Sequence, residues 1–219
     1  MLSASHGHHV DVFEPNKVNI IRECQSMWLN QLDNAEEDEI VARTTKRGSI
    51  NIRPYGVGAN TTTMEFYVGR NPGKASVVRD MYSAKRKTLV SKINVVTLDS
   101  MAHDLGWFEK KSPIVILKVD VEGFEPSVFA GAKKLLQSGL IENILMEVTG
   151  RKYNSENQRM LKLIMDSGYH LHQVGGLLGP DVEVTLSISD NVPKALLAVW
   201  TKEPGMEANL WWRNTKTSE

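Results

Sequence analysis

The sequence predicts an α/β fold in which short strands and helices alternate around a mainly parallel sheet, and three observations support this. First, β-rich apolar runs alternate along the chain with segments of helical periodicity. Second, the run Ile114 to Val119 (IVILKV) is almost entirely apolar, which is typical of a parallel strand covered on both faces. Third, 219 residues suffice for one domain with a substantial core.

The first half of the chain contains four predicted strands and one predicted helix. The strands are expected at 10–13 (VDVF), 49–57, 61–68 and 93–98, with residues 58–60 as the turn between the second and third. The helix begins after Pro15, because proline suits the first helical turn. Its apolar residues form an uneven stripe, namely Val18, Ile21, Met27 and Trp28.

The second half continues the alternation after the strand at 114–119. A helix begins at Pro126 and ends near Gly139, and its apolar side consists of Val128, Phe129, Ala132, Leu135 and Leu136. Further elements are expected as a strand at 143–148, a helix at 157–166, and strands at 169–174 and 195–200. The polar segment 204–219 is expected to be a tail that folds back through Trp211 and Trp212 or is partly loose.

Composition excludes several classes of function. Lys plus Arg and Asp plus Glu each count 26, and this zero net charge argues against nucleic acid or an acidic membrane as the main partner. The single cysteine, Cys24, allows no internal disulfide and no cysteine-cluster zinc site, and no histidine has metal-ligand spacing, so we predict no metal. The longest apolar run, 195–200, is far shorter than the ~20 residues of a membrane span. Residues 1–10 do not have the pattern of a signal peptide, so we expect a soluble protein of a reducing compartment, the cytoplasm being favoured.

Acidic residues follow or interrupt three of the predicted strands. Glu14 follows the first strand, Asp120 and Glu122 follow the strand at 114–119, and Glu147 lies within the strand at 143–148. Ligands bind at the carboxyl ends of the strands in such a sheet, where an acid can accept both hydroxyls of a ribose. Glu14 equally suits a charge near a helix N-terminus, which the helix dipole stabilises by about 0.3–1 kcal/mol. Position alone leaves both interpretations of Glu14 open.

The segment KVDVEGFEPSVFAGAKKLL (118–136) is the most informative part of the chain. Asp120 leaves a buried strand, where desolvation and neighbouring acids would favour a role as proton acceptor, and Glu122 is the second candidate. Gly123 permits a positive φ before the next helix begins. Glu125 suits helix capping or compensation of the helix dipole.

The order of these motifs resembles the FkbM-type family of S-adenosylmethionine-dependent methyltransferases. The resemblance covers about residues 10–174 and follows the motifs FEPN (13–16), a strand with a G-x-G turn, VVTLD (95–99), ILKVDVEGFEPSVFAGA (116–132), ILMEV (144–148) and MDSGY (165–169). It implies a Rossmann-like class I methyltransferase sheet with flanking helices over 1–203, incomplete at the N-terminus, and a C-terminal tail at 204–219. Members of the family mostly methylate hydroxyl groups of sugars or secondary metabolites.

The same resemblance implies a set of site residues. Glu14, with Asn16 in the same motif, would bind the methyl donor S-adenosylmethionine, Glu14 through the ribose. Gly56 and Val57 would lie beside the adenine. Asp120 would lie near the transferred methyl group and the acceptor.

One feature departs from the family pattern. That pattern begins with a strand and a D-x-G-A-N-x-G turn about 20 residues before the acid of FEPN, but only 13 residues precede Glu14. The VGAN at 57–60 is not this turn, because it follows FEPN and leads into a strand pattern. We therefore expect unpaired sheet edges and weak or no donor binding, and micromolar affinity for S-adenosylhomocysteine would contradict that expectation.

Two hypotheses for the function follow from these observations. The first is an enzyme that methylates an oxygen, or less favourably a nitrogen, of a small molecule or sugar, with Asp120 as proton acceptor. The second is a degenerate, non-catalytic domain that keeps the fold and acts in binding or assembly. An NAD-type dehydrogenase ranks last, because the G-x-G-x-x-G fingerprint is not found before FEPN.

Overall fold

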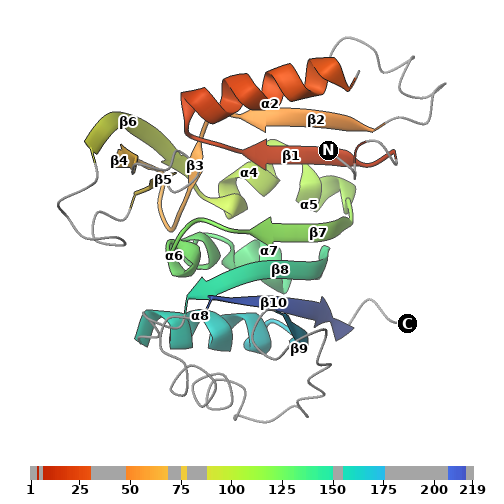
Figure 1. Ribbon diagram of the computed structural model, residues 1–219. Helices are drawn as coiled ribbons and strands as arrows, with labels where there is room; N and C mark the ends of the chain where they lie inside the picture. The colour runs from red at the N-terminus through yellow and green to blue at the C-terminus, as the bar shows by residue number, and fades with distance from the viewer. Residues whose placement is uncertain are drawn as a thin grey trace. The chain divides into compact units, whose positions relative to one another are not determined.

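The computed structural model describes residues 4, 7–30, 48–68, 75–77, 88–149, 155–175 and 207–215. They form a mixed α/β protein with multi-stranded sheets and flanking helices, consistent with the predicted Rossmann-like fold (Figure 1). The chain divides into two compact units, the first being Met1–Gly56, Thr62–Met64 and Lys92–Val95, and the second Val57–Thr61, Glu65–Ser91 and Val96–Glu219. None of the helices in these described ranges has the length and apolar character needed to cross a bilayer.

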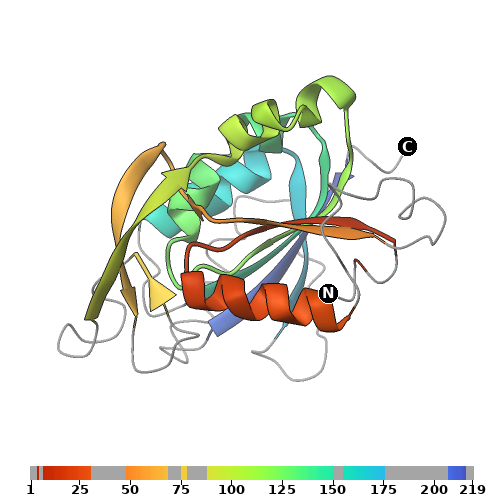
Figure 2. The same cartoon turned by 90° about the horizontal axis from the view of Figure 1, so that it is seen from above.

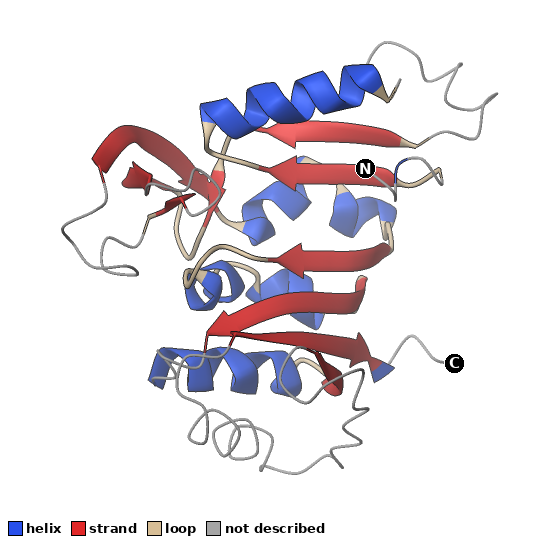
Figure 3. Ribbon diagram, viewed as in Figure 1, coloured by secondary structure: helices blue, strands red, loops and turns tan. Residues whose placement is uncertain are grey.

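The first unit contains a parallel strand pair and a helix, as the sequence predicts. Strands β1 (His9–Phe13) and β2 (Ser49–Arg53) pair in parallel, and Figure 3 shows helix α2 (Lys17–Leu29) running beside them. Their small core consists of Ala4, Met27 and Ile50, with Val10, Val12 and Ile52 packed against it. The predicted apolar stripe of α2 is largely exposed: Met27 alone of its four residues is buried, and Trp28 is 74% exposed. Only one narrow side of the helix meets this small core.

The predicted strand at 49–57 is two strands, β2 and β3 (Gly56–Val57). Pro54 has no N–H to donate to a strand ladder, and the N–H of Tyr55 donates locally to the Arg53 carbonyl at 2.8 Å. Strands β3, β6 (Thr88–Val96), β4 (Thr62–Val68) and β5 (Ala75–Ser76) follow one another in a four-stranded sheet. The segment after VGAN is therefore a strand, which confirms that prediction.

The second unit is built on a four-stranded sheet in the order β7-β8-β10-β9. Strands β7 (Ile114–Val119) and β8 (Ile141–Thr149) are parallel, whereas β10 (Glu207–Asn214) is antiparallel to β8 and to β9 (Tyr169–Gly175). Figures 1 and 2 show helices α6 (Glu125–Ala130), α7 (Lys133–Gln137) and α8 (Ser155–Asp166) on one face of this sheet. The buried side chains on that face include Val119, Phe129, Leu135, Leu136, Ile144, Met146, Val148, Leu161, Ile164, Leu210 and Trp212.

The C-terminal segment folds back onto the protein, which is the first of the two predicted alternatives, but it does so as a strand. Residues 207–214 form β10, which pairs with β8 on one side and β9 on the other. Leu210 and Trp212 are 1% and 0% exposed and alternate with exposed Asn209 and Arg213, the pattern of a strand with one buried face. The segment 195–200, predicted as a strand, lies outside the described residues.

Strand β7 also differs from its prediction, because it is not covered on both faces. Val115 and Ile116 are 45% and 51% exposed. Among the described strands, β7 pairs only with β8, so it is an edge strand of its sheet. In the first unit, β1 likewise pairs only with β2 within the part of the chain that the structure describes.

The helix predicted from Pro126 is interrupted at Gly131 and forms α6 and α7. A Cβ at position 131 would lie 2.1 Å from the carbonyl oxygen of Gly58, so only glycine permits this close backbone approach. The amide of Ala59 completes the contact by donating to the Ser127 hydroxyl at 3.1 Å. The five residues predicted to form the apolar side of the helix are all buried, so that prediction is confirmed.

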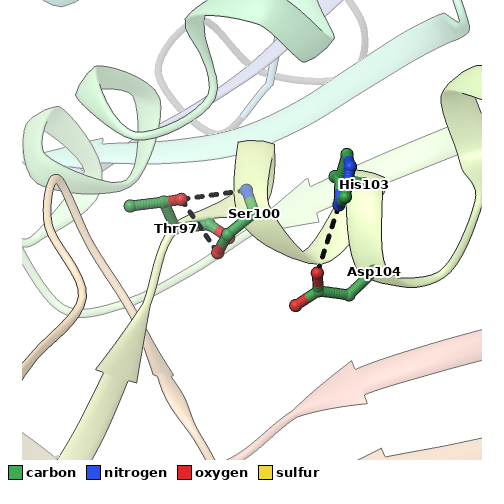
Figure 4. A network of polar contacts seen from close by, with 4 residues as sticks. All are labelled: Thr97, Ser100, His103 and Asp104. Carbon is green, nitrogen blue, oxygen red and sulfur yellow. Dashed lines mark hydrogen bonds and ion pairs between the residues drawn. The ribbon is translucent and has the colours of Figure 1, made fainter.

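Two short helices, α4 (Leu98–Asp104) and α5 (Trp107–Lys110), were not predicted. Thr97 begins α4 by accepting a hydrogen bond from the Ser100 amide at 3.0 Å (Figure 4). Asp99 caps α7 instead of its own helix, because its carboxylate accepts the amides of Lys134 at 3.1 Å and Leu135 at 2.9 Å. The Asp99 amide also donates to the Gly131 carbonyl at 2.9 Å, so the backbone around Asp99 is tied to the backbone around Gly131.

Replacing Asp99 with alanine should destabilise the protein by about 0.5–2 kcal/mol, because two amides of the first turn of α7 lose their acceptor. Urea titration of both proteins gives their free energies of unfolding and therefore this loss of stability. Asp104→Ala is the matched control on the same helix: Asp104 is exposed, and its ion pair with the equally exposed His103 (Figure 4) lies in solvent, so its loss should cost little. Equal losses in the two variants would contradict the capping role.

Candidate functional site

The turn after β7 holds the residues on which the sequence analysis placed most weight. Glu122 and Gly123 both have positive φ, 54° and 90°, so the chain reverses sharply before α6. Glu125 is 5% exposed, and its Oε1 accepts the amides of Val121 at 3.2 Å and Gly123 at 3.1 Å. Glu125 therefore stabilises the turn that precedes the helix. It lies in the first turn of α6, where an acid suits the helix dipole as predicted, but its hydrogen bonds come from the turn and not from the helix amides that a cap would bind.

Burial is the largest cause that raises the pKa of Glu125, and the charge of Asp120 acts in the same direction. The hydrogen bonds from the turn act in the opposite direction and do not outweigh burial. The carboxyl group therefore favours its protonated form more in the folded than in the unfolded chain.

The variant Glu125→Gln should gain stability relative to wild type as the pH rises. A carboxyl group with a raised folded-state pKa contributes stability at low pH that is lost as the pH rises through that pKa. Glutamine keeps an acceptor oxygen for the two amides but does not titrate. Urea unfolding of both proteins from about pH 4 to about pH 7.5 measures the difference. A difference that is constant, or that shifts in favour of wild type, would contradict the role of burial.

A hollow of about 280 Å³ lies at the carboxyl ends of β7 and β8, within the second unit. The described residues that line it come from β7, β8, β10 and the turn after β7, and they are Lys118, Asp120, Leu145, Met146, Glu147, Asn209, Leu210 and Trp211. The volume is near the lower end of ligand pockets, about 300 Å³. Polar groups at one end and an indole ring beside them make it the candidate site of this unit.

Asp120 lines this hollow, but its surroundings differ from those predicted. The side chain is 39% exposed and its Oδ2 forms an ion pair with Lys118 Nζ at 3.1 Å. Asp120 is thus not desolvated, because it follows a strand that pairs on one side only among the described strands. Glu122, the second predicted catalytic residue, is half-buried and is not among the described residues that line the hollow.

Glu147 and Asn209 complete the polar part of the site. Glu147, noted as a strand acid, lies directly opposite Asn209 in the β8–β10 pairing, and Leu145 lies opposite Trp211. Asn209 and Trp211 were not predicted as site residues, because residues 204–219 were expected to be a tail. The alternation of apolar and polar residues along EANLWWRN (207–214) is the signal that could have revealed a strand there.

Glu14 and Asn16, the predicted donor-binding pair, lie at the start of α2 in the first unit. Glu14 is half-buried, and its Oε1 and Oε2 accept hydrogen bonds from the Asn16 amide at 2.7 Å and the Asn19 side chain at 3.1 Å. The pKa of Glu23, on α2, is raised mainly by burial and, to a smaller extent, by the charge of Glu14. A carboxylate has about four acceptor positions, so Glu14 can still accept a ribose diol. Asn16 is buried and caps α2 by accepting the Val18 amide at 3.0 Å.

Gly56, predicted to lie beside the adenine, has a packing role in the first unit. It is buried, and a Cβ there would lie 3.0 Å from Ile93 Cδ1 and 3.3 Å from Val95 Cγ2. Packing against Ile93 and Val95 therefore explains why this position is glycine, and no ligand is needed to explain it. Val57, its neighbour in β3, is half-buried.

Comparison with known proteins adds one positive finding. Residues 2–171, more than half of the chain, match the family described as Methyltransferase FkbM domain. Neither the curated proteins nor the solved structures give a match. Within the described residues, no group of three or more His, Cys, Asp or Glu side chains is placed to hold a metal ion. The match begins before β1 and ends within β9, so β10 lies outside it.

Proposed function

The chain belongs to the FkbM methyltransferase family, and from this membership we propose that it transfers a methyl group from S-adenosylmethionine to a hydroxyl oxygen of a small molecule or sugar. The family match carries the proposal, and the position of Asp120 in a hollow at the carboxyl ends of two parallel strands supports it. Glu14 supports the donor assignment, because its two carboxylate oxygens are held in place at the carboxyl end of β1.

S-Adenosylmethionine, when bound, supplies the methyl group as an electrophile and leaves as S-adenosylhomocysteine. The residues of the chain have to orient the acceptor hydroxyl and take its proton as the new O–CH₃ bond forms. Asp120 is our candidate for both tasks. Its Oδ2 contacts Lys118, so Oδ1 is the atom to which the acceptor hydroxyl would donate its proton. Lys118 and Asp120 both line the hollow, and their ion pair engages one oxygen of the carboxylate.

Transfer of a radiolabelled methyl group tests this function. The protein is incubated with methyl-labelled S-adenosylmethionine and a panel of hydroxyl-bearing small molecules, including simple sugars and phenols. We expect label to enter at least one acceptor and S-adenosylhomocysteine to form in equal amount. Hydrolysis of the donor without acceptor-dependent label, or no reaction with any member, would contradict the proposal.

A second candidate is the non-catalytic domain that acts in binding or assembly. One observation favours it: β7 pairs on one edge only among the described strands, and Ile116 on it is 51% exposed. An edge strand with exposed apolar residues is suited to pairing with another strand. Binding of S-adenosylhomocysteine without any transfer activity would favour this candidate over the enzyme.

A further inference from the structure

Helix α2 has two apolar sides, and only one of them packs in the core of the first unit. The inward residues recur at helical spacing, and Met27 among them is buried in that core. The outward side carries Val18, Ile21, Trp28 and Leu29, which are 51%, 57%, 74% and 72% exposed. Among the described residues, four of the seven exposed large apolar side chains therefore lie on this one helix.

The outward side of α2 has the spacing of a short coiled-coil seam. Positions 18, 21, 25 and 28 follow one another at intervals of three, four and three residues, as the a and d positions of two heptads do. Three of these positions are apolar, and the fourth is Gln25, which is exposed. A single polar residue in such a seam lowers stability but fixes how two helices align. This side is therefore suited to packing against another helix.

The exposed apolar area is large enough for a contact between two copies of the chain. From their exposed fractions, the four side chains present on the order of 500 Å² per copy, within the range of the largest apolar patch of a typical monomer. Two such patches in contact would bury about 1,000 Å², which is the area that a specific interface needs. A largely exposed indole such as that of Trp28 is also the kind of side chain that dominates the affinity of interfaces.

The charges of α2 favour an antiparallel arrangement of the two copies. The last turn of the helix contains no basic residue, so no side chain there offsets the negative end of the helix dipole. Lys17 begins the helix and is exposed. In an antiparallel pair, each Lys17 lies beside the C-terminal end of the other helix and its Trp28 ring, which favours a cation at both places. Arg22 flanks the seam, where its guanidinium can extend into water.

We propose that the outward side of α2 binds the same side of a second copy of this chain, with the two helices antiparallel. Val18 then lies opposite Trp28 of the other copy, and position 21 lies opposite position 25. The two-fold axis passes near position 23, so the exposed Cys24 thiols of the two copies lie close together. The interface uses none of the residues assigned to the methyl donor or the acceptor, and it goes beyond the proposed function.

Sedimentation velocity of the whole protein, from micromolar to near-millimolar concentration, tests this interface. We expect the mass to rise from the 24.5 kDa of one chain towards twice that value. Ile21→Glu should raise the dissociation constant of the dimer at least about tenfold, because a charge would be buried in the seam. Ile116→Glu is the matched control on β7: it changes an isoleucine that is 51% exposed, against 57% for Ile21, and it should dimerise like wild type. Circular dichroism establishes that both variants are folded.

Cross-linking through Cys24, the only cysteine of the chain, tests how close the two helices lie. A short bismaleimide should join wild-type copies into a covalent dimer, and Cys24→Ser should lose this product but keep the reversible dimer. In the Cys24→Ser background, Val18→Cys copies should cross-link to Leu29→Cys copies and much less to one another. The reason is that antiparallel pairing separates the two positions 18 by about 15 Å along the helix axis.

A monomer at every concentration, or the same loss of dimer in Ile21→Glu and Ile116→Glu, would overturn the proposal. A dimer that is lost only in Ile116→Glu would overturn it too and would assign the contact to the edge of β7. Preferential cross-linking between Val18→Cys copies would contradict the antiparallel arrangement. A monomer that binds vesicles of phosphatidylcholine and phosphatidylserine, and loses this binding in Trp28→Glu, would assign the outward side of α2 to a lipid surface instead.

Discussion

The variant Asp120→Asn is expected to lose about 10²–10⁴-fold of the methyl-transfer rate with the acceptor that the labelled assay identifies. Asparagine has nearly the shape of aspartate and still accepts a hydrogen bond, but it cannot take the proton of the hydroxyl. Asp120 is 39% exposed at the end of an edge strand, so the substitution should leave the fold intact. The measurement is kcat at saturating donor and acceptor, with the unfolding midpoint as a check of stability.

Two control variants separate proton transfer from the other roles of this turn. Lys118→Gln breaks the ion pair with Asp120 but leaves the carboxylate in place, so its loss of kcat should be much smaller. Glu122→Gln tests the second candidate, which does not line the hollow among the described residues, and it should have little effect. A wild-type rate in Asp120→Asn, or equal losses in Asp120→Asn and Lys118→Gln, would remove Asp120 from the chemistry.

The variant Trp212→Ala should lower the free energy of unfolding by about 3–5 kcal/mol. The indole is fully buried on the helix-covered face of the second unit's sheet, and alanine would leave a large cavity there. A loss of this size is a large part of the 5–15 kcal/mol that stabilises a typical domain. Urea unfolding followed by circular dichroism measures it.

Trp211→Ala is the matched control for this cavity, because it removes the same side chain from the adjacent position on the open face. Trp211 is half-buried and its removal leaves a wider hollow instead of a closed cavity, so the loss of stability should be distinctly smaller. If both variants lose the same stability, or if Trp212→Ala loses under about 1 kcal/mol, strand β10 is not the core element described above.

Much of the fold could be predicted because hydrophobic patterning alone marks buried elements. Strand β8 and the buried side of α6 and α7 followed from apolar runs and helical spacing, whereas the apolar run of β7 predicted its strand but not its exposure. Other features depend on contacts between distant segments. The interruption at Gly131 is set by the Gly58 carbonyl, and Asp99 caps a helix that begins more than 30 residues later. Local sequence has no signal for such contacts.

The site was less predictable than the fold. Asp120 was identified from its place after an apolar strand, but its exposure depends on β7 being an edge strand, which pairing decides. Trp211 and Asn209 became site residues only because β10 inserts between β8 and β9. A short strand in a polar segment has a weak pattern, and its partners are far away in sequence.

Calorimetric titration with S-adenosylhomocysteine, up to millimolar ligand, tests most directly whether the chain holds the methyl donor through Glu14. We predict that wild-type protein binds the ligand, but only weakly, as the sequence leads us to expect. Glu14→Gln should weaken this binding at least about tenfold, because a charged acceptor of the ribose diol is lost, and Glu109→Gln, which changes an exposed acid on α5, should bind like wild type. No heat of binding from the wild-type protein, or the same affinity in Glu14→Gln, would contradict this prediction.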